Sequence, residues 1–290
     1  DAQAAFLFRL GSLRRQEFED VDGALQAFRD VLEREPGHGG ALAALEELLE
    51  VPECTERVLD ILEPVYEMGE NHERVAWLAW KRLELLDDPF DRAQLLERIA
   101  ELSEHQLGDA ARAMDAFGHA LIQRPDETRY LEEVERLAEE LGRWAEGGAV
   151  LENILQREDL DDSVIFNLSL KCADWYAEKL ADVQRAQAYY QIALSKEPEN
   201  PDALAKVESI YRSLGEIQPL IDILQRKSEI EYDLEAKKEI LAEVADLAEN
   251  ALNDPAAAAK AWKTIAEQDE TDPRAQDALI RLYEAAQDWE

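Results

Sequence analysis

The side chains that most often carry catalysis or bind metals are few in this sequence. Its four histidines are His38, His72, His105 and His119, and none of their spacings matches a metal-binding motif. His105 and His119 could meet on successive helices, but a surface position is the simpler interpretation. There is no glycine-rich phosphate loop and no serine or cysteine nucleophile motif. We therefore expect no metal, no cofactor and no enzymatic activity.

The two cysteines, Cys54 and Cys172, are predicted to be small buried apolar residues rather than a disulfide or a reactive pair. This fits a reducing compartment without excluding a bacterial envelope location. The chain begins at Asp1 without methionine, so a cytoplasmic and an envelope location both stay open. No segment approaches the ~18 apolar residues of a membrane span, so we expect no membrane insertion.

Carboxylates are the abundant charged groups. The chain has 66 Asp and Glu against 31 Lys and Arg, a formal net charge of −35. Such a field repels phosphate backbones and anionic lipids, which argues against nucleic acid and membrane surfaces as partners. It attracts basic protein segments. The alternative is that the charge keeps a large surface soluble or reflects a salty habitat, and the sequence leaves both open.

The elements that position these side chains are predicted to be helices. Apolar residues make up 46% of the chain, which is enough for a continuous core. Gly and Pro together number only 22 of 290 residues, which leaves little room for long loops. Ala, Leu, Glu, Arg and Gln, all good helix formers, dominate the rest.

One internal pattern occurs four times: an Asp, an Ala four residues later, an aromatic residue four further on, and usually a Pro eight beyond that. The copies are Asp20-Ala24-Phe28-Pro36, Asp109-Ala113-Phe117-Pro125, Asp182-Ala186-Tyr190-Pro198 and Asp254-Ala258-Trp262, with Glu270 replacing Pro in the last. They begin 89, 73 and 72 residues apart. The near-equal periods indicate a repeat architecture, with one interval longer by about one helix.

The pattern describes a capped helix with one packing face. Asp caps the first turn, Ala and the aromatic residue share one side, and Pro ends the helix. Thirteen residues before each Ala lies another small residue on a preceding helix: Gly11, Ala100, Ala173 and Ala245. Each copy is therefore predicted to be the second helix of a two-helix hairpin.

These hairpins resemble tetratricopeptide repeats, in which the second helix reads Ala, aromatic, Ala, Pro at spacings of 4, 3 and 5. Two copies match fully, Ala113-Phe117-Ala120-Pro125 and Ala186-Tyr190-Ala193-Pro198, and two match in part. A degenerate hairpin that lacks the signature Ala follows each strong one, giving a double-hairpin period near 72 residues. The resemblance implies an all-α, right-handed superhelical α-solenoid.

We predict sixteen helices between residues 2 and 287, forming a single solenoid over residues 1–290 with an inserted helix near residues 40–50. Asp288 and Trp289 align with Arg143 and Trp144, which begin a hairpin. The sequence is therefore interpreted as a fragment of a longer array, and we expect end-to-end self-association at this terminus.

The resemblance also implies a ligand groove, because first helices of the hairpins line the concave surface in this family. The acidic positions that it places there are Glu97, Glu101, Glu104, Glu132, Glu139, Asp174, Glu178, Glu239, Asp246 and Glu249. They predict a groove for a basic or extended peptide, unless acids cover every face equally. The chaperone-binding branch holds a terminal carboxylate with basic residues, and Glu97 and Glu101 at comparable places disfavour that ligand.

We therefore predict a scaffold or adaptor that binds a protein or peptide. Trp77 and Trp80 cannot both point inward with Leu78, so one of them is a candidate exposed anchor, although core packing is the simpler interpretation. Two alternatives remain: a structural spacer within a very large bacterial repeat protein, with no ligand of its own, or the regulatory arm of a larger enzyme.

Overall fold

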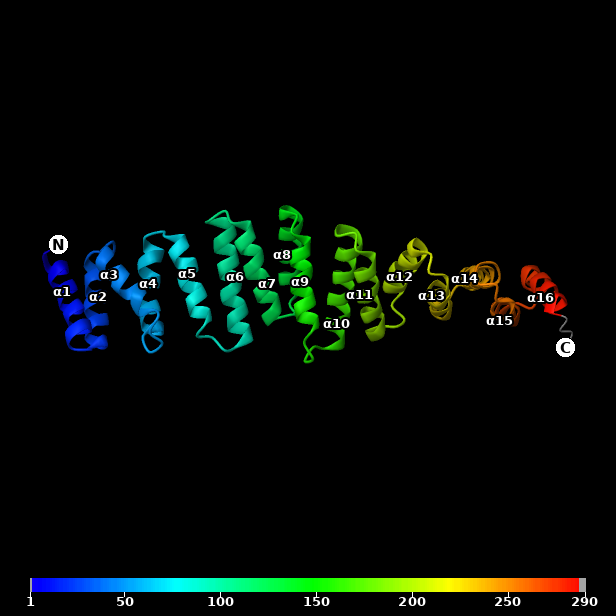
Figure 1. Ribbon diagram of the computed structural model, residues 1–290, viewed down its shortest axis with the longest axis horizontal. Coiled ribbons are helices and arrows are strands. Elements are labelled where there is room, and N and C mark those ends of the chain that lie inside the picture. Colours follow the sequence, from blue (N-terminus) through cyan, green and yellow to red (C-terminus); the bar gives the residue numbers. More distant parts are fainter. Residues whose placement is uncertain (1, 287–290) are drawn as a thin grey trace. The chain divides into compact units, whose positions relative to one another are not determined.

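The computed structural model describes residues 2–286, which form sixteen α-helices joined by short turns, with no strand among them (Figure 1). This confirms the predicted all-α class and the predicted helix count. The predicted helix end at residue 287, and Asp288 and Trp289, lie outside the described residues, so association through them stays a prediction. No helix of residues 2–286 is long and apolar enough to cross a membrane.

The chain divides into two compact units, unit 1 (Asp1–Val150) and unit 2 (Leu151–Glu290). Unit 1 contains α1 (Ala2–Glu17), α2 (Val21–Arg34), α3 (Gly39–Leu48), α4 (Thr55–Met68), α5 (His72–Leu83), α6 (Pro89–His105), α7 (Ala110–Gln123) and α8 (Thr128–Leu141). Helix α9 (Trp144–Leu155) crosses the boundary. Unit 2 contains α10 (Asp162–Asp174), α11 (Val183–Lys196), α12 (Pro201–Leu214), α13 (Ile217–Ile230), α14 (Leu234–Asp246), α15 (Pro255–Gln268) and α16 (Pro273–Ala286). Two π-helical turns, η1 (Trp175–Lys179) and η2 (Leu247–Ala251), continue α10 and α14.

The four predicted signature hairpins share one turn geometry. Each signature Asp donates its backbone N–H to a carbonyl six residues earlier: Asp20 to Arg14, Asp109 to Ser103, Asp182 to Tyr176 and Asp254 to Ala248, at 2.8–3.0 Å. Each Asp carboxylate also accepts from the N–H three residues later, which caps the second helix. The preceding residue always has a positive φ, namely Glu19, Gly108, Ala181 and Asn253. The repeated sequence pattern therefore encodes a repeated tight turn.

The small and aromatic signature residues form the core between the paired helices. The signature alanines Ala24, Ala113, Ala186 and Ala258 are fully buried, as are Ala100, Ala173 and Ala245 on the partner helices. Three of the four rings, Phe28, Phe117 and Tyr190, are also buried, whereas Trp262 is half-buried. Each buried ring contributes roughly 1.5–3 kcal/mol of apolar transfer free energy. The interior position of these residues is the one that the spacing predicted.

Both cysteines are buried and unpaired, as expected. Burial raises the pKa of the Cys172 thiol to about 12, so its reactive thiolate form is suppressed at neutral pH. Cys54 lies just before α4 among apolar side chains of the core of unit 1. Both therefore act as small apolar residues of the interior.

In unit 1, ion pairs join alternate helices into two layers. The pairs Arg15–Glu47, Arg74–Glu46, Lys81–Glu50 and Arg112–Glu73 connect α1, α3, α5 and α7 in turn. The pairs Asp22–Arg57, Glu67–Arg98, Glu97–Arg129 and Glu104–Arg136 connect α2, α4, α6 and α8. Because α2 and α7 are both signature second helices but belong to different layers, the two layers exchange roles within the unit.

The exchange takes place at α3, α4 and α5, three helices where unit 2 has only α12 and α13 between signature hairpins. Helix α4 has two roles. It packs on α2 as a second helix would, yet its Glu67–Arg98 pair with α6 occupies the place of the Arg212–Glu243 pair between α12 and α14. An odd number of helices makes this double role necessary. That residues 40–50 are the inserted helix stays a prediction. The single continuous solenoid over residues 1–290 stays a prediction as well.

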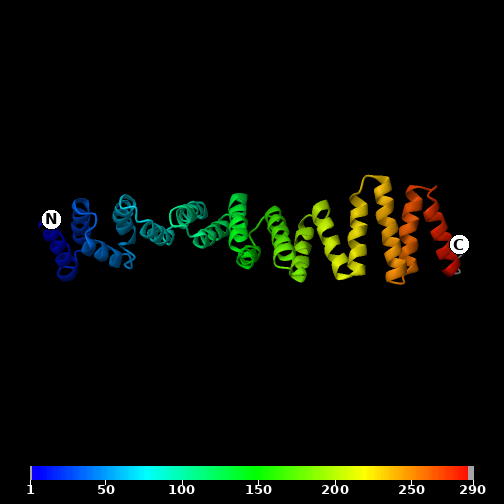
Figure 2. The ribbon, with the colours of Figure 1, turned by 90° about the horizontal axis from the view of Figure 1, so that it is seen from above.

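In unit 2, first helices and second helices keep their own layers. Viewed from above, α13 to α16 lie side by side (Figure 2). Ion pairs connect the first helices α10, α12, α14 and α16 in order. The second helices α11 and α13 are connected by the amide–carboxylate contact between Gln187 and Glu216. Unit 2 therefore presents one ion-paired layer and one layer with fewer polar connections.

Candidate partner-binding surfaces

The predicted acidic positions of α6 form ion pairs with the next first helix. Glu97 and Glu101 both contact the Arg129 guanidinium of α8, at 3.4 Å for Glu101. Glu97 also accepts a hydrogen bond from the Tyr130 hydroxyl at 3.2 Å. Burial, together with the Glu97 carboxylate, raises the pKa of Tyr130 to about 12, so this hydroxyl remains a donor at neutral pH. The structure thus brings Glu97 and Glu101 together around one cation.

The other predicted acids of unit 1 surround a second arginine or lie on its helix. Arg136 of α8 contacts Glu104 of α6 at 2.7 Å and Glu133 of its own helix at 2.8 Å. The hydrogen bond that Arg136 donates to Glu104 is the largest influence that raises the pKa of Arg136. Glu132 and Glu139 are exposed on α8. The predicted acidic surface therefore contains fixed arginines as well as carboxylates.

In unit 2 the predicted acids differ in how strongly they are bound. Asp174 is mostly buried, accepts a hydrogen bond from the Tyr190 hydroxyl and pairs with Lys206 of α12. Glu178 in η1 is exposed. Asp246 is exposed near the end of α14 and accepts a hydrogen bond from an asparagine amide one turn later, at 2.7 Å. Asp174 is thus a structural group, whereas the other two face solvent.

The remaining two predicted acids join α14 and η2 to α16. Glu239 contacts Arg274 at 2.7 Å and keeps an exposed side chain. Glu249 receives two hydrogen bonds from the Arg281 guanidinium. This contact holds the pKa of the Glu249 carboxyl below its usual range. Here too a carboxylate of one first helix meets an arginine of the next.

Sequence reasoning identified the acids but did not pair them with basic residues, although the sequence contains a signal for the pairing. Four of the pairs join residues 32 positions apart: Glu97–Arg129, Glu104–Arg136, Asp174–Lys206 and Glu249–Arg281. The first helices that these pairs join begin 39 residues apart, so a separation of 32 places the base about two turns nearer the start of its helix than the acid is in its own. An acid followed by a base at that interval therefore predicts an ion pair between neighbouring hairpins.

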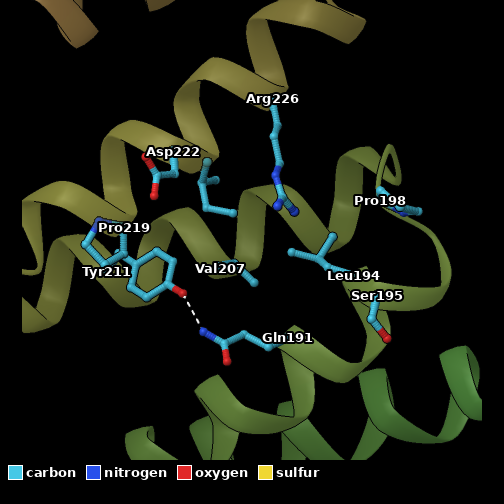
Figure 3. A pocket seen from close by; sticks show the side chains of 10 residues that line it. Gln191, Leu194, Ser195, Pro198, Val207, Tyr211, Pro219, Asp222 and Arg226 are labelled. Atoms are coloured by element: carbon cyan, nitrogen blue, oxygen red, sulfur yellow. Dashed lines mark hydrogen bonds between the residues drawn. The ribbon is translucent and has the colours of Figure 1, made fainter. Parts of the chain in front are cut away.

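A groove on the second-helix layer of unit 2 was not predicted at all. It lies among α11, α12 and α13 and has a volume of about 530 Å³ (Figure 3). Leu194, Val207 and Ile223 supply apolar lining, and the amide of Gln191 donates to the Tyr211 hydroxyl at 2.9 Å. The guanidinium of Arg226 points into the groove from α13 (Figure 3).

The predicted tryptophan anchor lies on α5 of unit 1, in the layer of α1, α3, α5 and α7, and not in the layer of α6 and α8 that carries the predicted acids. Trp77 and Trp80 on α5 are both half-buried, while Leu78 between them is fully buried. The Arg74 guanidinium lies 5.2 Å from the Trp77 ring centre, and His119 of α7 meets the edge of Trp80 at 5.6 Å. Neither indole is a free anchor, because each already has a partner.

Within residues 2–286, no group of three or more His, Cys, Asp or Glu side chains is placed to hold a metal ion. His38 accepts a hydrogen bond from the Ala41 N–H and caps α3. His119 contacts the Asp115 carbonyl oxygen of its own helix at 2.7 Å. These two histidines thus have local structural contacts.

No protein-family model matches the chain, and no curated protein matches it significantly in sequence. Among solved structures it is similar to a chain of Naa15/Naa10 bound to HypK-THB, with 16% identity, a TM-score of 0.39 and 96% of this chain covered. The chain spans only 39% of that protein. A tetratricopeptide repeat protein of Parabacteroides merdae is 13% identical, with a TM-score of 0.30, covering 97% of this chain and 99% of that one.

A repeat-containing protein of Cytophaga hutchinsonii is 14% identical, with a TM-score of 0.37, over 87% of this chain and 98% of that one. At these values the assignment of the fold depends on the geometry of the chain itself. That geometry consists of the repeated Asp caps, the repeated tight turns and the buried small and aromatic residues of the hairpins. The chain is an all-α array of tetratricopeptide-like helical hairpins.

Proposed function

We propose that this chain is a protein-interaction scaffold in which the first-helix layer of each unit, taken separately, binds a basic, extended segment of a partner protein. The observation that carries the proposal is the ordered arrangement of carboxylates on α6 and α8 in unit 1 and on α10, η1, α14 and η2 in unit 2. The arginines that bridge them hold several of these carboxylates in place. A partner then has less side-chain entropy to freeze on binding.

Ion pairing inside the chain does not exhaust its carboxylates. With 66 acids and 31 bases, pairing every cation once still leaves an excess of 35 acids. Helix α8 alone has five glutamates and two arginines, so it keeps a negative balance. A carboxylate also has about four lone-pair sites, so one that binds an internal arginine can accept a second donor. Lysine and arginine side chains of a partner fit this chemistry.

The negative field predicts a binding rate and affinity that fall as salt is added. Exposed charges are screened beyond about 8 Å at physiological ionic strength. The chain as a whole attracts basic segments from a distance, whereas the positions on the first helices determine where such a segment is held. These two contributions can be separated by comparing equal charge changes on different faces.

The test uses a fluorescent 16-residue peptide of alternating lysine and glycine with the full chain of 290 residues. One variant neutralises three exposed acids of the first-helix layer of unit 2, Glu178→Gln, Glu239→Gln and Asp246→Asn. The matched control neutralises Glu199→Gln, Glu229→Gln and Glu267→Gln, which are exposed elsewhere in the same unit. We expect at least a fivefold larger loss of affinity in the first variant.

Equal losses in the two variants would mean that the peptide responds to net charge alone, and the first-helix layer would have no special role. Absence of binding even at low salt would favour the spacer alternative. The inter-hairpin ion pairs would then serve to stiffen the array rather than to arrange a binding surface.

A further inference from the structure

Arg226 is unusual among the arginines of this protein. Most of them have a carboxylate within 4 Å, whereas Arg226 has none within the part of the chain that the structure describes. Arg226 is exposed to solvent, and its guanidinium points into the groove of unit 2 (Figure 3). Five N–H donors beside an apolar lining match a carboxylate carried next to an apolar side chain.

A corresponding groove occurs in unit 1. It lies between α2 and α4, with a volume of about 570 Å³. Four lining positions of α2 occupy the same places in the repeat as four of α11: Arg29 corresponds to Gln191, Leu32 to Leu194, Glu33 to Ser195 and Pro36 to Pro198. Four facing positions of α4, Ile61, Pro64, Val65 and Met68, have the same spacing as Pro219, Asp222, Ile223 and Arg226 of α13. Helix α4 adds Asp60, which pairs with Arg82 of α5 at 2.8 Å.

The unit 1 groove also has an arginine without a carboxylate partner among the described residues, Arg29 on α2. Its apolar surface is more open, because Met68 is 80% exposed. The arginine comes from the signature helix in unit 1 and from the facing helix in unit 2. Each groove thus combines an apolar lining with one guanidinium that has no carboxylate partner within residues 2–286, beside an exposed carboxylate of its own, Asp222 in unit 2 and Glu33 in unit 1.

A third copy of the signature helix differs at one of these lining positions. In α7 the position of Arg29 and Gln191 is occupied by Gly118. A Cβ atom at Gly118 would lie 3.2 Å from Cγ2 of Val150, so α9 approaches α7 closely there. A long side chain at this position in α2 and α11 is incompatible with that approach. A long side chain at this position thus accompanies the open grooves on α2 and α11, whereas Gly118 accompanies the close approach of α9 to α7.

We propose that these two grooves, on α2–α4 and on α11–α13, each dock a short partner segment that presents a large apolar side chain next to a carboxylate. The apolar side chain contacts the lining, Leu32 and Ile61 in unit 1 or Leu194 and Ile223 in unit 2. The carboxylate accepts hydrogen bonds from Arg29 or Arg226. In unit 2 the groove is formed mainly by the second helices α11 and α13, whereas in unit 1 the groove on α2 and α4 belongs to the same ion-paired layer as α6 and α8. Both grooves select the charge opposite to that of the basic segment.

The long-range field opposes an acidic segment, so its recognition depends on short-range contact. Added salt screens this repulsion as well as the pairing, and the apolar contact is unaffected at moderate salt. We therefore expect affinity for such a segment to change less than twofold between about 50 and 300 mM salt, a range over which the Debye length falls from about 14 Å to about 6 Å. The basic peptide of the proposed function should weaken strongly over the same range.

The test uses fluorescence anisotropy of a labelled helical peptide with two leucines one turn apart and a glutamate beside them. A second peptide has lysine in place of that glutamate. The variant Arg29→Glu with Arg226→Glu removes the available guanidinium from both grooves. The matched control, Arg9→Glu with Arg34→Glu, changes two other exposed arginines that line neither groove, with the same change in net charge.

We expect the glutamate peptide to lose at least tenfold in affinity for the groove variant and less than threefold for the control. The lysine peptide should bind the groove variant better than it binds the parent chain. Equal losses in both variants, equal binding of the two peptides, or no binding of the glutamate peptide to the parent chain would each overturn the proposal. The triple first-helix variant should leave this binding unchanged, which separates it from the proposed function.

Discussion

The first signature hairpin, α1–α2, and the third, α10–α11, share the Asp cap and the tight turn, which together we call the frame. They differ in the side chains that pack around the signature ring. In both, the signature Asp donates to the carbonyl six residues earlier, at 3.0 Å for Asp20 and 2.8 Å for Asp182. In both, the ring eight residues after that Asp is buried, as Phe28 or as Tyr190. The backbone geometry is thus independent of which ring fills the space.

What differs is the environment that each ring requires. Phe28 packs against Gly11, where an added Cβ would lie 2.8 Å from its Cε1 atom. Tyr190 packs in a hairpin that has Ala173 at that place and Asp174 next to it, which accepts the hydroxyl hydrogen bond. The small residue and its neighbour have therefore adapted to the ring, while the cap and turn have not changed. The cap and the turn are therefore the same in both hairpins, whereas the packing around the ring is specific to each one.

The largest effect is expected from removing the ring in the apolar hairpin. Phe28→Ala leaves a cavity in the core of unit 1 and should lower the free energy of unfolding by about 3–5 kcal/mol. Urea unfolding followed by far-ultraviolet circular dichroism measures this. Phe28→Leu is the control for volume and should cost clearly less. A loss below about 1 kcal/mol for Phe28→Ala would show that the hairpin collapses around the gap and that the ring does not set its frame.

A smaller effect is expected from Tyr190→Phe, which keeps the ring and removes the hydroxyl. Hydrogen bonds to charged groups contribute roughly 1.5–3 kcal/mol, and Asp174 keeps Lys206, so we expect about 1.5 kcal/mol. Burial and the Asp174 carboxylate raise the pKa of Tyr190 above its ordinary value near 10. The stabilisation is therefore complete below about pH 10 and is lost as the pH rises from there toward the folded-state pKa.

The check on this sign is a series of urea midpoints between about pH 8 and 11, a window set by the ordinary tyrosine pKa. Stability of the parent chain should fall at the alkaline end, and Tyr190→Phe should reduce that fall. The other buried tyrosines contribute equally to both proteins, so the difference isolates residue 190. A parallel alkaline decline in the two proteins would remove the hydroxyl from the explanation of the third hairpin.

Much of the frame could be predicted from the sequence because it depends on local chemistry. The Asp caps, the small residues at Ala24 or Ala113 and the aromatic spacing each determine a contact within one hairpin. These interactions span few residues, so their spacing is visible directly. The exchange of layers around α3, α4 and α5 could not be read in this way. It depends on which neighbour α4 packs on, and the sequence gives only an interval that is one helix longer.

The candidate surfaces were less predictable because they depend on contacts between hairpins. Acidic positions such as Glu97 and Glu104 could be placed on a helix face, but their pairing with Arg129 and Arg136 requires the stacking of α8 on α6. The grooves depend on how closely two second helices approach. At Gly118 of α7 the neighbouring Val150 side chain comes within 3.2 Å of where a Cβ would lie, and a contact of that kind is visible only in the structure.

A third prediction tests how closely the first hairpin is fitted to its ring. Gly11→Ala gains about 1 kcal/mol of helix propensity, but the new Cβ forces Phe28 to move, and overpacking costs typically about 1–3 kcal/mol. We expect a net loss of about 1 kcal/mol, measured by urea unfolding. Ala173→Gly in the third hairpin should also lose stability, for the opposite reason. A gain for Gly11→Ala would mean that the two hairpins accept the same small residue.

The smallest effect is expected at the turn, where the four hairpins share a conformation but not a residue. Ala181 has φ 53° and Gly108 has φ 65° at equivalent places. A left-handed residue other than Gly costs about 1–2 kcal/mol, whereas Gly costs about 0.4–1 kcal/mol through the entropy of the unfolded chain. Ala181→Gly should therefore stabilise the chain by roughly 0.5–1 kcal/mol, and Gly108→Ala should destabilise it by a similar amount.

These two substitutions are reciprocal, so measuring both by urea unfolding cancels errors that are specific to one hairpin. The closing hydrogen bond to the signature Asp is made by the backbone and should survive in each variant. Opposite signs of similar size would show that the turn is strained wherever it lacks glycine. If both variants were destabilised, each turn would have adapted to its own residue. The turn would then belong to the locally fitted part of the hairpin rather than to the repeated frame.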